Sequence, residues 1–141
     1  KIKLFFLAPV MYFLFYVLVI LILFWFKMPF ALNLSLGFIF IELFCAVIKL
    51  IYRKERPIPQ LRKIFYDKID ANSFPSVHSA RISLLVTMIS LYYESFFVLI
   101  VGIILMLGVG YSRIYLKRHD YIDVICGFLI GILTAIVIFY I

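Results

Sequence analysis

The sequence predicts an all-α fold: an integral membrane helical bundle of about five transmembrane helices. Three observations support this prediction. Of the 141 residues, 67% are hydrophobic, the mean hydropathy is +1.18, and several apolar runs exceed the ~18 residues that indicate a membrane helix. A soluble domain of this length could not bury so much apolar surface. We expect residues 1–141 to form a single membrane-embedded domain.

The expected spans cover about residues 4–26, 30–52, 75–92, 96–115 and 121–141. Short turns at residues 27–29 and 93–95 join two pairs of spans, and residues 53–74 form a long polar connector. The first span carries no charge and is apolar all round, which suits a helix that faces lipid.

Basic residues gather on one side of the expected bundle. If the connectors alternate sides, 13 of the 14 Lys and Arg residues fall on the side of the N-terminus and of the 53–74 and 113–120 connectors, and only Lys27 on the other. The net charge of +7 favours anionic partners such as lipid headgroups or phosphates. Nucleic acid is not an expected partner, because no large soluble basic surface is present.

Residues 112–123 lie between the last two apolar runs and contain three basic residues, two carboxylates and a histidine. His119 and Asp123 are four residues apart, so they share one face if the last span is already helical there. A carboxylate one turn from an imidazole can accept its Nδ1 proton and leave Nε2 as a nucleophile or base. The alternative is a basic loop that obeys the positive-inside rule.

A second cluster is Lys49, six further residues, then Arg56 and Pro57. Seven residues are about two helical turns, so both cations share a face if the helix continues that far. Such a pair suits a phosphate dianion; the alternative is two basic side chains that reach for the membrane interface. Glu42, seven residues before Lys49, either supports that lysine or forms a hydrogen bond to the third span.

The third cluster is residues 73–79. Pro75 suits the first turn of a helix, and the N–H groups of Ser76 to His78 would then form an anion site at the helix N-terminus. His78 would reach whatever those groups hold. The alternative is a capped helix start with an incidental histidine.

Small residues recur at three- and four-residue steps in two spans. They are Ser76, Ser79, Ser83, Thr87 and Ser90 in the third span, and Gly127, Gly131 and Ala135 after Asp123 in the fifth. Such rows let membrane helices approach closely. Because the glycines share a face with Asp123, close packing of the last span should point Asp123 inward.

The three clusters, in this order, resemble the type 2 phosphatidic acid phosphatases, membrane lipid phosphatases related to the vanadium haloperoxidases. The family pattern is K-x6-R-P, then P-S-G-H, then S-R-x5-H-x3-D. It is matched by three stretches, namely Lys49-x6-Arg56-Pro57, Pro75-Ser76-Val77-His78 and Ser112-Arg113-x5-His119-x3-Asp123.

The resemblance implies phosphate chemistry that needs no metal or other cofactor. His119 would attack phosphorus and form a phosphohistidine, Asp123 would orient His119, and His78 would act as general acid. The phosphate would be held by Lys49, Arg56, Arg113, Ser76 and the backbone N–H of Val77.

Two departures from the family pattern stand out. Val77 replaces the usual glycine; its N–H can remain in place, but its branched side chain would narrow the pocket. The family commonly has six spans, whereas two rather than three precede the first motif here. An upstream helix or a reduced form would each account for this.

The expected function is that of a lipid phosphatase acting on a lipid phosphate or polyprenyl diphosphate, whose chain enters sideways between helices. The rivals are a phosphotransferase with an acceptor other than water, and a non-catalytic lipid-phosphate binder or transporter. The expected location is the plasma membrane. The uneven distribution of Lys and Arg predicts that the expected active site lies on the cytoplasmic side of the membrane, whereas the resemblance favours the outer side.

Overall fold

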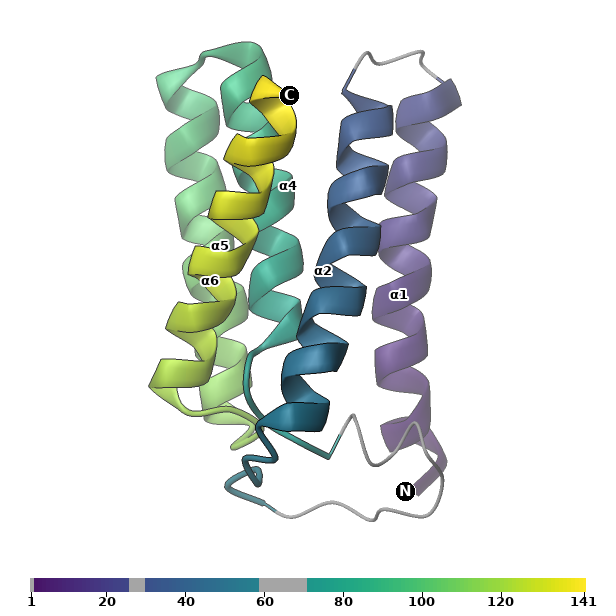
Figure 1. Ribbon diagram of the computed structural model, residues 1–141, viewed down its shortest axis with the longest axis vertical. Coiled ribbons are helices and arrows are strands. Elements are labelled where there is room, and N and C mark those ends of the chain that lie inside the picture. Colours follow the sequence, from purple (N-terminus) through teal and green to yellow (C-terminus); the bar gives the residue numbers. More distant parts are fainter. Residues whose placement is uncertain (1, 26–29, 59–70) are drawn as a thin grey trace.

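The computed structural model describes residues 2–25, 30–58 and 71–141, with side chains from Leu14 onward. Five helices make up this part of the chain and run along its long axis (Figure 1). They are α1 (Ile2–Trp25), α2 (Ala31–Ile51), α4 (Val77–Tyr93), α5 (Phe96–Tyr115) and α6 (Tyr121–Tyr140). Helices α2, α5 and α6 are long and apolar enough to cross a membrane. The all-α prediction is confirmed, and each helix end lies within two residues of its expected span.

The connectors alternate between the two ends of the bundle, as expected. The described parts of the long connector, residues 52–58 and 71–76, lie at the same end as the α5–α6 connector, and the α4–α5 turn lies at the opposite end (Figure 1). The expected turn at residues 27–29 and the middle of the long connector, residues 59–70, lie outside the described residues.

Helix α4 lies inside the bundle, and α6 approaches it very closely. A Cβ atom on Gly127 would lie less than 3 Å from the carbonyl oxygen of Ser76, and one on Gly131 less than 3 Å from that of Ala80. Only glycine allows two helix backbones to come this near. The predicted close packing is confirmed, and Asp123, at the start of the same face, is fully buried.

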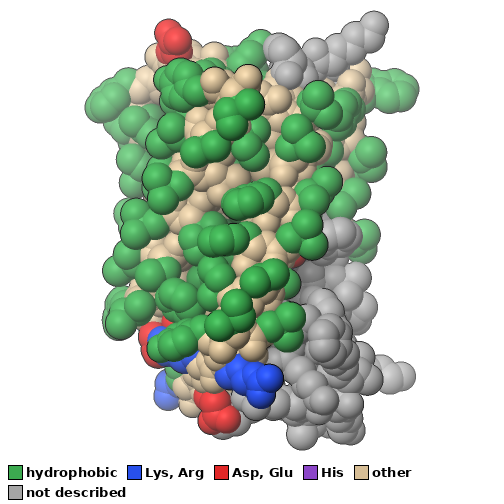
Figure 2. Space-filling view, viewed as in Figure 1, with side chains coloured by type: hydrophobic (Ala, Val, Ile, Leu, Met, Phe, Trp, Pro, Cys, Tyr) green, Lys and Arg blue, Asp and Glu red, His purple; other side chains and the backbone are tan. Residues whose placement is uncertain are grey.

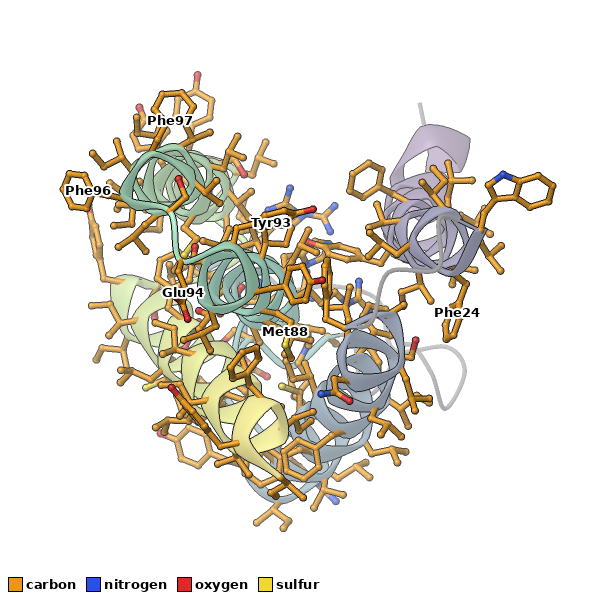
Figure 3. All side chains as sticks on the ribbon, turned by 90° about the horizontal axis from the view of Figure 1, so that it is seen from above. Phe24, Met88, Tyr93, Glu94, Phe96 and Phe97 are labelled. Carbon is orange, nitrogen blue, oxygen red and sulfur yellow. The ribbon has the colours of Figure 1, made fainter. Side chains whose placement is uncertain are left out.

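The apolar interior lies between α2, α4 and α6. Its most buried side chains include Ile41, Leu84 and Met88, and Figure 3 shows Met88 pointing into the bundle. Phe96 and Phe97 of α5 point outward instead. On the face shown in Figure 2, hydrophobic side chains cover the surface along the helices, while most of the visible charged ones gather at one end. This distribution suits a bundle surrounded by lipid.

A partly buried ion pair joins α2 to α4. The Arg81 guanidinium, on the second turn of α4, donates to the Glu42 carboxylate of α2. It also lies 5.7 Å from the ring centroid of Tyr16 in α1 and 5.4 Å from that of Phe38 in α2, within the range of a cation–π contact. Of the two roles expected for Glu42, the structure shows the hydrogen bond to the third span.

Candidate active site

The structure brings the three sequence clusters together at the polar end of the bundle. Lys49, Arg56, Ser76, Arg113, His119 and Asp123 are all buried there. They come from the end of α2, the long connector, the start of α4, the end of α5, the α5–α6 connector and the start of α6. Residues up to 74 positions apart in the chain therefore surround one small volume, and burying three cations requires compensating negative charge or a bound anion.

His119 and Asp123 face each other as the four-residue spacing predicts. His119 Nδ1 lies 3.7 Å from Asp123 Oδ2. This distance permits an ion pair but is longer than a hydrogen bond. Asp123 Oδ2 also accepts the backbone N–H of Asp120 at 3.0 Å. Asp120 is the N-cap of α6 and forms a capping box with Asp123, so the start of the helix fixes the carboxylate behind the imidazole.

The surroundings keep His119 neutral. Burial lowers the pKa of its imidazole, and the Lys49 and Arg56 cations lower it further, while Asp123 acts in the opposite direction. The lowering prevails, so the neutral form is favoured at physiological pH. A neutral imidazole is the form that can act as a nucleophile.

Helix α4 starts later than the sequence suggests. Ser76 is the N-cap and Val77 the first helical residue, so the expectation that Pro75 lies in the first turn is wrong. The Ser76 N–H does not point toward a ligand either, because it donates to the carbonyl oxygen of Asp123 at 3.0 Å. The N–H groups of Val77 and His78 remain in the first turn, where helices leave donors available for anions.

The side chains of Ser76 and Val77 have structural roles of their own. The Ser76 hydroxyl accepts from the N–H of Ser79 at 3.4 Å and from its hydroxyl at 2.9 Å, which caps α4. It still has its own proton to donate. The Val77 side chain packs against the apolar core, which explains how valine fits where the family has glycine.

Lys49 and Arg56 do not share a helix face, contrary to the two-turn argument. Helix α2 ends at Ile51, and the chain then leaves helical geometry. Hydrogen bonds to the far end of the connector hold the segment that follows: Asn72 donates to the Lys49 carbonyl at 2.8 Å, and the Ser73 N–H to the Lys54 carbonyl at 2.8 Å. This fold places Arg56 near enough to affect the pKa of His119, as Lys49 does from the helix end.

Arg113 lies in the last turn of α5, and the chain reverses just after it. Lys117 adopts a left-handed conformation with φ of 52°, which ends the helix. Its N–H donates to Ile114, and the N–H of Arg118 donates to the Arg113 carbonyl at 3.1 Å. This tight turn brings His119 back toward the bundle.

One lysine at the site was not singled out from the sequence. Lys54 Nζ lies 2.7 Å from Asp123 Oδ1 and 3.0 Å from Asp120 Oδ2. In the sequence it is one of several basic residues in a polar connector, and nothing in its spacing separates it from its neighbours. Only the hydrogen bonds that fold the connector back onto α2 place it beside α6.

A groove of about 860 Å³ opens beside the candidate site, between α1 and α5 and over α4. Viewed down the bundle, α1 and α5 lie on either side of α4 (Figure 3). Most of the groove is apolar, and its polar end is formed by His78, Ser112 and Arg113. The other lining residues are Phe15, Tyr16, Ile82, Ile104, Leu105, Gly108 and Val109.

Within the described ranges, no three His, Cys, Asp or Glu side chains are grouped so that they could hold a metal ion. The charged groups that surround His119 and His78 are mainly cations: Lys49, Arg56, Arg81 and Arg113. This end of the bundle is therefore suited to bind an anion.

The fold agrees with comparisons to known proteins. The chain matches the PAP2 superfamily over residues 30–141 and belongs to that family. It is 33% identical over 89 residues to the bacitracin transport permease protein BcrC of Bacillus licheniformis, covering 63% of this chain and 42% of that protein. The structure resembles a transmembrane PAP2 type phosphatidylglycerolphosphate phosphatase from Bacillus subtilis, with a TM-score of 0.73 and 25% identity, covering 89% of this chain and 68% of that one.

Proposed function

We propose that this protein is a metal-independent membrane lipid phosphatase that removes the terminal phosphate of a lipid phosphate or polyprenyl diphosphate. The observation that carries the proposal is that an apolar groove leads directly into the cluster of buried charged residues. An apolar groove between α1 and α5 ends at His78 and Arg113, beside buried cations and the His119–Asp123 pair. A lipid phosphate has the same two parts in the same order. The PAP2 relatives support a phosphatase activity located in the cell membrane.

In the proposed first step, His119 Nε2 attacks phosphorus and the bond from phosphorus to the leaving oxygen breaks. Asp123 steadies the Nδ1 proton, since its carboxylate lies 3.7 Å from that atom. Lys49, Arg56 and Arg113 hold the phosphate together with the Ser76 hydroxyl and the Val77 N–H. They balance the charge that develops on its oxygens, which is the main demand of phosphoryl transfer.

His78 is proposed to give its proton to the leaving oxygen. Its side chain lines the groove that would hold the lipid, so it lies on the side from which the leaving group departs. In the second step water attacks the phosphohistidine, and neutral His78 takes a proton from that water. The Nε2–phosphorus bond then breaks, and inorganic phosphate leaves.

The direct test is phosphate release by purified protein in detergent, with EDTA present. The substrate panel is a polyprenyl diphosphate, phosphatidate and phosphatidylglycerophosphate. We expect at least one to release phosphate in the presence of chelator, with water as the acceptor. Transfer of the phosphate to an added alcohol without free phosphate would instead indicate a phosphotransferase. Binding without any turnover would indicate a lipid-phosphate binder.

Replacing His78 with alanine is expected to slow lipid phosphates far more than an activated aryl phosphate. An alkoxide leaving group needs a proton, whereas a nitrophenolate leaves with little assistance. The measurement is kcat for both substrate types across pH, and the alkaline limb of the lipid profile should flatten. Equal slowing of both substrates, with that limb unchanged, would remove His78 from the acid role.

Filling the groove is expected to affect long-chain substrates selectively. A Cβ on Gly108 would have no atom within 4 Å, so Gly108→Phe places a ring in the groove without a backbone clash. We expect kcat/KM for a long-chain lipid phosphate to fall about tenfold or more, since the chain loses apolar contact area. A short aryl phosphate should be affected little.

The matched control is Leu107→Phe, an exposed neighbour on α5 that does not line the groove. It should leave both substrates unaffected. Equal kinetics of wild type and Gly108→Phe on the long-chain lipid would show that the chain binds elsewhere.

A further inference from the structure

Lys54 makes the shortest ion pair with the carboxylate behind His119. Its Nζ lies 2.7 Å from Asp123 Oδ1, while Asp123 Oδ2 faces His119 Nδ1 at 3.7 Å. The two oxygens of one buried carboxylate thus serve two partners. Lys54 comes from the connector after α2, 69 residues before Asp123, so the fold of the connector must hold it there.

The contact is part of a small network rather than an isolated surface pair. Lys54 Nζ also lies 3.0 Å from Asp120 Oδ2, and the Asp120 N–H donates to Asp123 Oδ2. The connector is fixed at this point, because the Ser73 N–H donates to the Lys54 carbonyl. The Asp123 side chain is 0% exposed and that of Lys54 24%. A short contact to a fully buried carboxylate is screened far less than one between two exposed groups.

We infer that Lys54 is a positioning residue for the proposed phosphatase reaction: it keeps Asp123 ionised and correctly placed while preventing that carboxylate from turning His119 into an imidazolium. The inference rests on the proposed function. A buried carboxylate without a cation would either take up a proton or favour a protonated histidine beside it. Protonated Asp123 could not hold the His119 Nδ1 proton, and protonated His119 could not attack phosphorus.

The charged groups around His119 and Asp123 determine in which direction the loss of Lys54 would change their protonation. Lys49 from α2 and Arg56 from the connector face His119 and oppose its protonation. His78 from α4 is close enough to interact electrostatically with His119, and it lines the same groove as Arg113 of α5. Asp123 acts in the opposite sense. Lys54 adds a positive charge beside both carboxylates, so removing it makes protonation easier for Asp123 and for His119 alike.

Lys54 remains charged over the range in which the enzyme would work. Burial lowers the pKa of its ammonium group, but Asp123 and Asp120 outweigh this and leave the pKa above its ordinary value of 10.5. Its charge is therefore constant across the acidic limb of the activity profile, and any shift of that limb reports on Asp123 and His119.

The test compares wild type with Lys54→Gln, Lys54→Met and Lys54→Arg, using a soluble aryl phosphate so that lipid binding does not enter. The measurement is kcat from pH 4 to 9, with thermal unfolding of each variant as a check on folding. We expect the acidic limb to move up by about one pH unit in the two uncharged variants, and Lys54→Arg to restore most of the shift.

The matched control is Arg53→Gln, which removes the same charge from the neighbouring residue. Arg53 is exposed and donates to the Leu50 carbonyl at 3.4 Å, so its profile should follow wild type. Having two uncharged variants allows the test to proceed if one of them does not fold.

An uncharged folded variant whose acidic limb coincides with wild type would overturn the inference. So would a uniform loss at every pH, since that indicates only that the connector and Arg56 have moved. A shift of equal size in Arg53→Gln would show a general charge effect and also overturn it. If wild type hydrolyses neither the aryl phosphate nor any lipid phosphate, the proposed function fails instead.

Discussion

Replacing His119 with alanine is expected to abolish phosphate release, with a loss in kcat on the order of 10⁴-fold or more. The expectation follows from the covalent step, because His119 is the imidazole that faces the Asp123 carboxylate, at 3.7 Å. The measurement is single-turnover and steady-state phosphate release in detergent. With wild type, acid-labile phosphate bound to the protein should be trapped during turnover.

The protein should still fold after this change, because the connector is held by backbone hydrogen bonds that His119→Ala does not remove. The matched control is Asp123→Asn, which keeps the size of the side chain. It should leave residual activity above that of His119→Ala, since the nucleophile remains but loses its orienting charge. Activity of His119→Ala within tenfold of wild type, free of contaminating phosphatase, would exclude His119 as nucleophile.

Among the glycines of the bundle, replacing Gly131 with alanine is expected to cause the largest loss of stability. The added Cβ would lie less than 3 Å from the backbone of Ala80 and Leu84 and from the Ser83 hydroxyl. Backbone atoms cannot rotate away, so α6 must move from α4. Overpacking of this kind costs about 3 kcal/mol, and it should lower the thermal unfolding midpoint clearly.

Gly108→Ala is the control for this change, because it adds the same methyl group to a helix where nothing lies within 4 Å. It should stabilise slightly, by at most about 1 kcal/mol, since alanine is the better helix former. If both variants unfold at the same temperature, the α4–α6 contact is looser than the structure indicates.

The sequence predicts most of this architecture because a membrane helix can be recognised from the apolar composition of its own segment. The five spans follow from apolar runs, and the spacing of Gly127 and Gly131 predicts that the last span packs closely against another helix. The structure shows that this helix is α4. His119 and Asp123 are also within reach of sequence reasoning, because a four-residue step is a local fact. Their pairing needs no knowledge of the remaining chain.

What sequence reasoning misses depends on contacts between distant segments. The two-turn spacing of Lys49 and Arg56 suggests one helix, yet α2 ends at Ile51 because the connector finds hydrogen bonds at Asn72 and Ser73. The role of Lys54 can be recognised only once it is known that the connector folds back onto α2. The partner of Glu42 is likewise not predictable from the sequence, because Arg81 lies 39 residues away. The position of Glu42 alone is compatible either with an interaction with Lys49 or with a contact to α4.

The hydrogen bond from the Ser76 N–H to the Asp123 carbonyl has a consequence for how substrate range can diversify. It joins α4, which carries His78, directly to α6, which carries Asp123. The close contacts at Gly127 and Gly131 hold the same two helices together. The groove walls on α1 and α5 belong to other helices. Under the proposed function, much of the lipid tail contacts α1 and the apolar part of α5, whereas the reacting groups lie on α4, at the polar end of α5 and around the start of α6. Substitutions at Phe15 or Ile104 can select a wider or narrower chain while the reacting groups keep their geometry.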